Sequence, residues 1–336
     1  MFDTKMQRYG DDSEKITSLV YVVLAMWKLP FGLFGNSSIV KIIMDADKAL
    51  ENLGEKVDYN RDALSASSIF VGLVIVQLLR LFSIWLILKN LNINIPAARV
   101  YQAVFSDTLA LIVTSFYCYF LSVLRNRYRY ANKVLAEINS QKAWEYKIFV
   151  RGRMPTNMHK AENLQDRLIS EKIKSCAKIY GMFYKVVVGV NDVFGFILLM
   201  TTLVSLIYVI LYLFYFLEAT SAGLFHDLPK YIDFCIYVFW QAAYGIAIVF
   251  LIVLFCEGVM REARQTSYIL HEIMSSDFSP TVTSEAMQLS LQLLHQRPTF
   301  TAHGLYKFNY ALFEQAARSV STYLVILLQF VTDANM

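Results

Sequence analysis

Long apolar stretches constrain this chain more than any other feature of its sequence. A helix needs about 20 mostly apolar residues to cross the ~30 Å hydrocarbon core of a bilayer. The chain is 56% hydrophobic and 17% charged, with a mean hydropathy of +0.43, a combination that is rare in soluble domains. We therefore predict an all-α polytopic membrane protein with six transmembrane helices. The six stretches that meet or approach the required length are residues 17–38, 69–91, 101–124, 194–216, 232–256 and 315–332.

The distribution of Lys and Arg predicts which loops are cytoplasmic. Residues 125–185 hold 14 of the 31 basic residues, whereas the connections 92–100 and 217–231 are short and hold few. Because cytoplasmic loops are enriched in Lys and Arg, we expect 125–185 inside the cell and the C-terminus outside. The same count places residues 1–16 outside, without a signal peptide to carry them there. One missing upstream span would resolve this difficulty.

The basic segments between the spans have helical patterns of their own. Residues 127–150 and 158–190 show apolar positions at helical spacing, separated by a Gly- and Pro-containing break at 151–155. Residues 257–314 show a similar pattern, broken near Pro280 and Pro298. We therefore expect long cytoplasmic helical extensions of the spans. The predicted organisation is three spans in 1–124, a cytoplasmic helical segment in 125–193, two spans in 194–256, a second cytoplasmic helical segment in 257–314, and the last span with an outer tail in 315–336.

Motifs of enzymes and metal proteins are absent from the sequence. The five histidines and four cysteines show no ligand or redox spacing, and there is no phosphate loop, no GxSxG and no dinucleotide fingerprint. Non-enzymatic function without a cofactor, a metal or a nucleic-acid partner is therefore expected. Among the ionisable residues inside the predicted spans, Arg80 is the best candidate for a functional role, because such a group is costly in a membrane. It is either functional or it reaches a carbonyl or carboxylate on a neighbouring helix.

The last 37 residues carry the most specific motif of the chain. Phe300-Thr301-Ala302 is followed by Thr322-Tyr323, a short apolar run and Gln329-Phe330. This order resembles the signature of the insect gustatory receptor family. Leu289 to His295 is a further, fairly specific match, and weaker matches extend the resemblance over nearly the whole chain. The weaker matches are Asp47 to Gly54, Leu124 to Asn132, and Asn191 with Phe194-Gly195.

The resemblance implies a fold, a function and an assembly. Members of the family are seven-span chemosensory receptors that resemble tetrameric channels in the plasma membrane, with the final helices lining the pore and the cytoplasmic helices forming an anchor. The six spans here then correspond to the second through seventh. The implied function is a ligand-gated, non-selective cation channel, a homo- or hetero-tetramer that detects a small tastant, either a sugar or a bitter compound.

The resemblance also implies which residues form the pore. Gln329 and Phe330 take the positions of the family's outer gate, Ile326 lies one helical turn below Phe330, and Tyr323 lies at the next turn. Apolar rings of this kind block ions by making water unfavourable in a constriction. Asp333 at the outer mouth would form a ring of carboxylates that favours cations. The alternative is that Phe330 and Ile326 are ordinary packing residues.

Two residues of the tail depart from the family pattern. Asn309 stands where the family usually has Asp, and Arg318 stands where a small or hydroxyl residue is common. Four guanidinium groups facing a pore would oppose cations. Arg318 is therefore expected to face away from the axis and to pair with Glu314 one turn earlier; otherwise conduction is in doubt.

A ligand pocket is expected among the outer halves of the spans, where aromatic residues gather. Aromatic faces suit sugars and flat alkaloids, with a few polar groups fixing orientation. Gln241 is the polar candidate, and it shares one helical stretch with two of the aromatic residues. The alternative is an interfacial belt of Trp and Tyr. The aromatic candidates are Trp85, Tyr208, Tyr212, Tyr237, Trp240 and Tyr244.

Other functions remain open on the sequence. A non-conducting co-receptor or regulatory subunit of the same family is made plausible by Arg318 and the missing span. A secondary transporter predicts internal repeats with broken helices in matching halves, which the sequence does not show. The sugar-responding branch of the family often has an acidic residue after Thr-Tyr, whereas Leu324 follows here, which argues weakly against that branch.

Overall fold

A computed structural model describes most of the chain. The described backbone comprises residues 5–35, 37–90, 96–150, 158–221, 228–276 and 278–334, and the described side chains comprise residues 12–27, 38–90, 96–97, 100–138, 140, 165–220, 228–276 and 278–329. Within these ranges the chain forms long helices and one small hairpin. The elements are α1 (Lys5–Gly35), α2 (Ser37–Asn52), α3 (Tyr59–Asn90), α4 (Ala97–Val150), α5 (Met158–Ser221), α6 (Leu228–Ser275), α7 (Pro280–His295), β1 (Thr301–Ala302), β2 (Tyr306–Lys307) and α8 (Ala311–Ala334).

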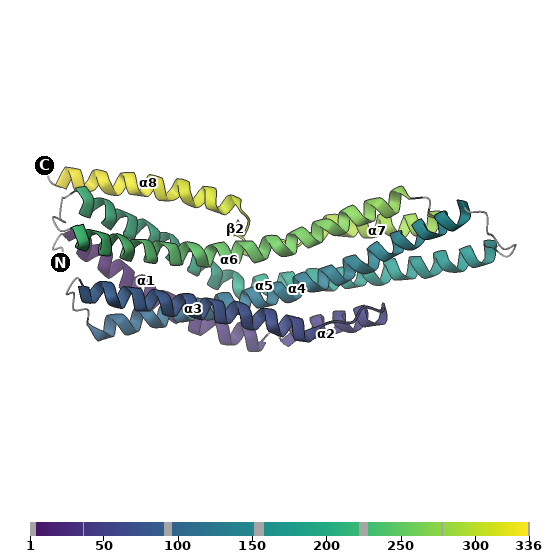
Figure 1. The fold of residues 1–336 in the computed structure, drawn as a ribbon, viewed down its shortest axis with the longest axis horizontal. Coiled ribbons are helices and arrows are strands. Elements are labelled where there is room, and N and C mark those ends of the chain that lie inside the picture. Colours follow the sequence, from purple (N-terminus) through teal and green to yellow (C-terminus); the bar gives the residue numbers. More distant parts are fainter. Residues whose placement is uncertain are drawn as a thin grey trace.

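The helices run roughly along the long axis of an elongated molecule (Figure 1). The beginning of α1, the end of α3, the end of α5 and the end of α8 gather at one end. The end of α4, the beginning of α5 and helix α7 lie toward the other end. The start and the finish of the described chain therefore share one end of the molecule, as the charge distribution predicts.

Three helices are much longer than a bilayer requires. Helices α4, α5 and α6 contain 54, 64 and 48 residues, so at 1.5 Å per residue α5 is about 96 Å long. Pro96, Pro229 and Pro280 lie at the beginnings of α4, α6 and α7. Proline is tolerated there because the first N–H groups of a helix have no partner within the helix. The helical patterns predicted on both sides of residues 151–155 are confirmed, since α4 ends at Val150 and α5 begins at Met158.

Four of the described helices are long and apolar enough to cross a membrane. They comprise Tyr59–Asn90, Val100–Ile138, Gln165–Thr220 and Leu228–Ser275. The first is the least buried, and one face of α3 exposes large apolar side chains such as Leu79, Phe82 and Leu86. A face of this composition is typical of contact with lipid. The predicted span 315–332 lies in α8, whereas the predicted span 17–38 runs past the end of α1 at Gly35 into the start of α2.

A buried core forms where α4, α5 and α6 meet, in the parts of these helices that lie outside the predicted spans. The rings of Tyr128, Tyr180 and Phe183 pack together, with centroids 4.7 to 5.9 Å apart. Beside them Asn132 Oδ1 accepts hydrogen bonds from the hydroxyls of Tyr180 at 2.7 Å and Thr266 at 2.6 Å. A buried polar group on each of the three helices is thereby satisfied, which fixes the rotation of the helices relative to one another.

A small hairpin corrects the expectation of an all-helical segment over 257–314. Strands β1 and β2 pair antiparallel, with Ala302 opposite Tyr306. The turn between them contains His303 and Gly304 with φ of 48° and 79°, a backbone conformation that favours tight turns between strands. Two residues per strand are too few for an alternating pattern, so the sequence has no period-2 signal here.

Candidate functional site

A cluster of charged and polar side chains lies among the spans, centred on Arg80 of α3. Its Nη1 donates to Asp107 Oδ2 of α4 at 2.8 Å and to Gln77 Oε1 at 3.3 Å. Its Nη2 donates to the side-chain oxygen of Gln241 on α6. The guanidinium also lies 4.0 Å from the ring centroid of Tyr244. Arg80 therefore connects three helices through contacts that are stronger away from water.

These residues border a small cavity, here named the Arg80 cavity. Its volume is about 40 Å³, which exceeds the room that one water needs but is far below the roughly 300–1,000 Å³ of a typical ligand pocket. The helices must separate before the cavity can hold a molecule of that size. The lining residues are Tyr21, Arg80, Ser106, Asp107, Ala110, Thr201, Val204, Ser205, Tyr208, Gln241, Tyr244, Gly245 and Ile248.

The predicted pocket residues fall into two groups. Tyr208, Gln241 and Tyr244 line the Arg80 cavity, and Tyr237 OH accepts a hydrogen bond from Gln241 Nε2 at 3.3 Å. Trp85 is 56% exposed and stacks on Phe82, on the outer face of α3. The structure thus brings together four of the seven aromatic and polar candidates and leaves Trp85 outside.

Two further aromatic candidates lie beside the cavity without lining it. Trp240 packs edge-to-face against its neighbour Phe239, which is 67% exposed. Tyr212 belongs to a run of edge-to-face contacts with Tyr208, Tyr215 and Tyr237, whose centroids are 6.0 to 6.3 Å apart. Its hydroxyl donates to Glu14 Oε1 of α1 at 3.0 Å. Tyr208 lines the Arg80 cavity, and Tyr212 and Tyr215 follow it along α5 toward the end of that helix at Ser221.

Sequence reasoning identified Arg80 but missed its partner. Asp107 is an acidic residue inside the predicted span 101–124, and an ionisable residue within a span is expected to find a partner. That rule names the class of partner but not its position, because Asp107 lies 27 residues away on another helix. The hydroxyls of Thr201 and Ser205 on α5 were missed for a different reason, since such residues are common in membrane helices.

Helix α8 lies at the edge of the bundle. It packs mainly on α5, and Phe313 also lies against Phe250 of α6, with ring centroids 5.9 Å apart. The side chains of Tyr323, Val325 and Ile326 are 55%, 54% and 39% exposed. Gln329 is exposed as well. The side chains of Phe330 and Asp333 lie outside the described residues, so their part of the predicted gate stays a prediction.

The predicted pairing of Arg318 is present in the structure. Its Nη2 donates to Glu314 Oε1 one helical turn earlier. Both side chains are exposed, at 78% and 67%, so the guanidinium carries a counter-charge on the same helix. An exposed pair of this kind contributes little to stability, but it places a negative charge beside the guanidinium.

The hairpin before α8 is held on α5 by a close backbone approach. Asn191 Nδ2 donates to the carbonyl of Thr299 at 2.7 Å, and the N–H of Thr301 donates to Asn191 Oδ1 at 3.2 Å. A Cβ on Gly195 would lie 3.0 Å from the backbone N of His303. Glycine at this position therefore permits the contact. Asn191 and Gly195, two residues of the weaker family matches, thus hold the hairpin against α5.

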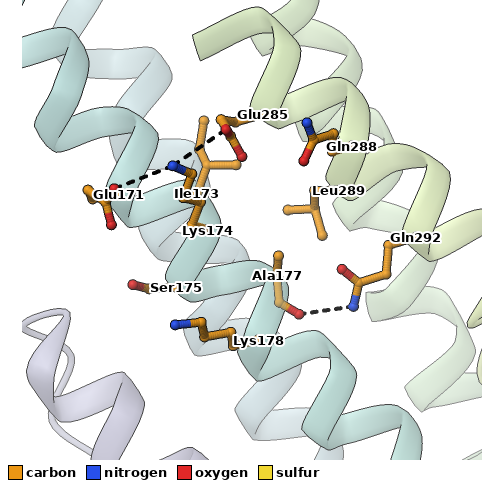
Figure 2. A pocket seen from close by; sticks show the side chains of 10 residues that line it. All are labelled: Glu171, Ile173, Lys174, Ser175, Ala177, Lys178, Glu285, Gln288, Leu289 and Gln292. Carbon is orange, nitrogen blue, oxygen red and sulfur yellow. Dashed lines mark hydrogen bonds and ion pairs between the residues drawn. The ribbon is translucent and has the colours of Figure 1, made fainter. Parts of the chain in front are cut away.

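A hollow larger than the Arg80 cavity lies elsewhere, between α5 and α7. Figure 2 shows this open groove, of about 450 Å³, with Lys174 between two carboxylates. Lys174 Nζ lies 3.4 Å from Glu171 and 3.6 Å from Glu285, and these carboxylates, Glu285 first, raise the pKa of Lys174. Gln292 Nε2 donates to the carbonyl of Ala177 at 3.0 Å. The groove is lined by polar contacts between α5 and α7, and it lies far from α8. Its greater volume therefore does not make it the functional site.

Comparisons with known proteins agree with this architecture. The model of the 7tm chemosensory receptor family matches residues 38–332. Putative gustatory receptor 28a of Drosophila melanogaster is 26% identical, with the alignment covering 98% of this chain and 77% of that protein. Putative gustatory receptor 28b of the same species is 21% identical, covering 86% of this chain and 62% of that protein.

A solved structure shares the fold. The insect olfactory receptor OR5 from Machilis hrabei aligns with a TM-score of 0.55, at 12% identity, over 98% of this chain and 90% of that chain. This likeness concerns the arrangement of helices alone. With a receptor-family match over most of its length and Drosophila gustatory receptors as relatives, the chain belongs to the 7tm chemosensory receptor family, among the insect gustatory receptors.

Proposed function

We propose that this chain is a receptor for a small tastant and is itself a ligand-gated, non-selective cation channel, with four copies surrounding a pore that α8 lines. The packing of α8 carries the proposal. This helix leaves Tyr323, Val325 and Ile326 exposed on a membrane-length segment at the edge of the bundle. A second copy of α8 is the natural cover for that face, because small closed rings satisfy equivalent faces on identical subunits.

Gating follows from the order of residues along α8. Rings formed by Ile326 and Phe330 would close the pore by dewetting, and Asp333 beyond them would attract cations. A ligand that prefers a wider form of the Arg80 cavity would shift the population toward the open state. The hairpin held by Asn191 supplies a connection, because it joins α5, which lines the cavity, to the beginning of α8.

The membrane position follows from the charges and the apolar faces. We place six spans in α1, α3, α4, α5, α6 and α8, with the end that carries the termini outside the cell. The halves of α4, α5 and α6 that extend beyond the spans would then form a cytoplasmic anchor together with α2 and α7. The basic residues Arg125, Arg127 and Arg129 mark the inner boundary, in accord with the positive-inside rule.

Cross-linking between copies tests the assembly. We expect Ile326→Cys to form intermolecular disulfides in the membrane, and the purified protein to have the mass of four chains. Leu79→Cys, on the exposed face of α3, is the matched control and should stay monomeric on a non-reducing gel. Cross-links at Leu79→Cys with none at Ile326→Cys would contradict a pore lined by α8.

The two alternatives predict different results in the same protein. A regulatory subunit would form tetramers only when a second family member is co-expressed. A transporter would need broken helices at its binding site, whereas α3 and α6, which carry Arg80 and Gln241, are continuous over their described residues. The continuity of these helices favours the receptor channel.

A further inference from the structure

The donors of Arg80 are not all used. A guanidinium has five N–H groups in a fixed fork, and the structure assigns Nη1 to Asp107 and Gln77, and Nη2 to Gln241. Among the described residues Arg80 Nε has no acceptor, although the side chain is only 6% exposed. Leaving a donor of a buried charged group without an acceptor is unfavourable, so this position calls for an oxygen that the chain does not supply.

A second open donor lies on the same face of α3. Gln77 is one helical turn before Arg80, is also buried, and has no acceptor for its Nε2 within the described part of the chain. The Arg80 cavity of about 40 Å³ adjoins the guanidinium. In the unliganded protein one water can fill this volume and accept from Nε. A ligand that replaces the water must therefore present an acceptor of its own.

The charges around the cavity exclude the two ionic classes of ligand. A cationic ligand would lie beside the Arg80 guanidinium in a medium of low dielectric, where like charges repel strongly. The aromatic face that normally receives an organic cation is already occupied, since Arg80 itself covers the ring of Tyr244 at 4.0 Å. An anionic ligand would compete for Arg80 and leave the Asp107 carboxylate buried without its partner.

Resting on the proposed receptor function, we propose that the Arg80 cavity takes neutral ligands with a hydroxyl, ether or carbonyl oxygen, and that Arg80 determines this specificity. The ligand oxygen accepts from Nε, and the hydroxyls of Ser106, Ser205 and Tyr208 line the rest of the site. Because Arg80 also holds α6 through Gln241, a ligand that enters the cavity and widens it strains the contact between α3 and α6. Arg80 thus both binds the ligand and connects α3 to α6.

Thermal stabilisation of the purified full-length protein in lipid nanodiscs tests the proposal. One set of probes is neutral and rich in acceptors: D-fructose, sucrose, myo-inositol and coumarin. The other set is cationic: quinine, denatonium and tetraethylammonium. We expect at least one neutral probe, and no cationic probe, to raise the unfolding temperature of the wild-type protein.

Two substitutions locate the effect at Arg80. Arg80→Lys keeps a positive charge near Asp107 and removes the Nε donor, so the affinity for the neutral probe should fall roughly ten- to a hundredfold, as for the loss of a hydrogen bond to a charged group. Arg264→Lys is the matched control, because Arg264 is an exposed arginine that pairs with Glu257 on α6. Its affinity should match the wild type. If Arg80→Lys does not fold, the double variant Arg80→Met/Asp107→Leu removes the pair together and should also lose binding.

Each remaining outcome overturns the inference. Stabilisation by a cationic probe that Arg80→Lys abolishes would show that the cavity takes cations. Unchanged affinity of Arg80→Lys for the neutral probe would show that Nε does not read the ligand, and a complete failure of the neutral set would contradict the ligand class. The measurement needs no current, so a protein that binds neutral probes but conducts nothing would refute the proposed channel alone.

Discussion

At the scale of single residues, the most consequential contact away from the cavity is a buried ion-pair cluster at the Arg-rich end of the third predicted span. Arg127 donates to both oxygens of Asp47 on α2, at 2.9 and 3.0 Å, and to Asp62 on α3. Asn126 donates to Asp62 at 2.7 Å and Tyr59 donates to Asp47 at 3.1 Å. Burial lowers the pKa of the Arg127 guanidinium, but Asp47 and Asp62 outweigh this effect and raise it.

Removing this guanidinium should destabilise the protein strongly. We expect Arg127→Met to lower the free energy of unfolding by about 3–5 kcal/mol, because two buried carboxylates lose their partner. Denaturant titration in detergent, followed by tryptophan fluorescence, measures the change. Arg264→Met removes an exposed pair and should stay within about 0.5 kcal/mol of the wild type. Equal effects of the two substitutions would mean that the cluster is solvated in the folded protein.

Cys176 gives a second residue-scale prediction, in the half of α5 that lies outside its predicted span 194–216. Burial raises the pKa of this thiol to about 12, so at neutral pH it is protonated and unreactive. Maleimide labelling at pH 7 followed by peptide mass spectrometry should leave Cys176 unmodified. In the same turn Lys178 is exposed, so Lys178→Cys should label within minutes. Rapid labelling of native Cys176 would show that this part of α5 opens readily.

The residues also show what sequence reasoning can reach. Arg318 and Glu314 are four positions apart on one helix, so their pairing could be predicted from helical geometry alone. The pairing of Arg80 with Asp107 could not, because it depends on which faces of α3 and α4 meet. Likewise Tyr244 and Tyr208 line the cavity whereas Trp85 is exposed. All three are aromatic residues within predicted spans, so the sequence alone does not distinguish them.

At the scale of elements, the hairpin between α7 and α8 depends on one glycine. The place that a Cβ of Gly195 would occupy is bounded by the backbone of His303 at 3.0 Å and of Thr301 at 3.2 Å. Backbone atoms cannot move aside as a flexible side chain can. The position therefore couples the orientation of α5 to the start of α8.

Gly195→Ala should displace the hairpin. We expect a loss of about 1–3 kcal/mol of stability, as for other overpacked sites, and faster proteolysis near residues 301–307. Gly72→Ala is the control, because a Cβ on Gly72 would meet nothing within 4 Å, and it should leave both readouts unchanged. If the two variants behave alike, the hairpin is not held against α5 in solution.

The elements also divide into those that periodicity predicts and those that it does not. The long helices α4, α5 and α6 follow from sustained apolar spacing. The hairpin was missed because its strands are two residues long and its stability comes from Asn191 and Gly195, more than a hundred residues earlier in the chain. Tertiary contacts of that range leave no local signal.

At the scale of the whole molecule, the described chain has both of its ends at one side and its longest helices extending to the other (Figure 1). Helix α8 lies at the edge of the bundle, with apolar side chains left exposed along a membrane-length helix. The Arg80 cavity is lined on α5 by Thr201 and Ser205, among others. In the proposed function the ligand and the pore are therefore on different helices, which are connected through α5 and the hairpin.

Resting current through the expressed protein tests this account most directly, because it needs no ligand. The wild-type chain and its Phe330→Ala variant would be expressed, confirmed at the cell surface and recorded for cation current. We predict a new leak in Phe330→Ala, since removing an apolar ring lets water and ions into the constriction, whereas Phe82→Ala on the exposed face of α3 should behave as the wild type. Absence of any leak, with surface expression confirmed, would contradict a self-sufficient channel whose gate is on α8.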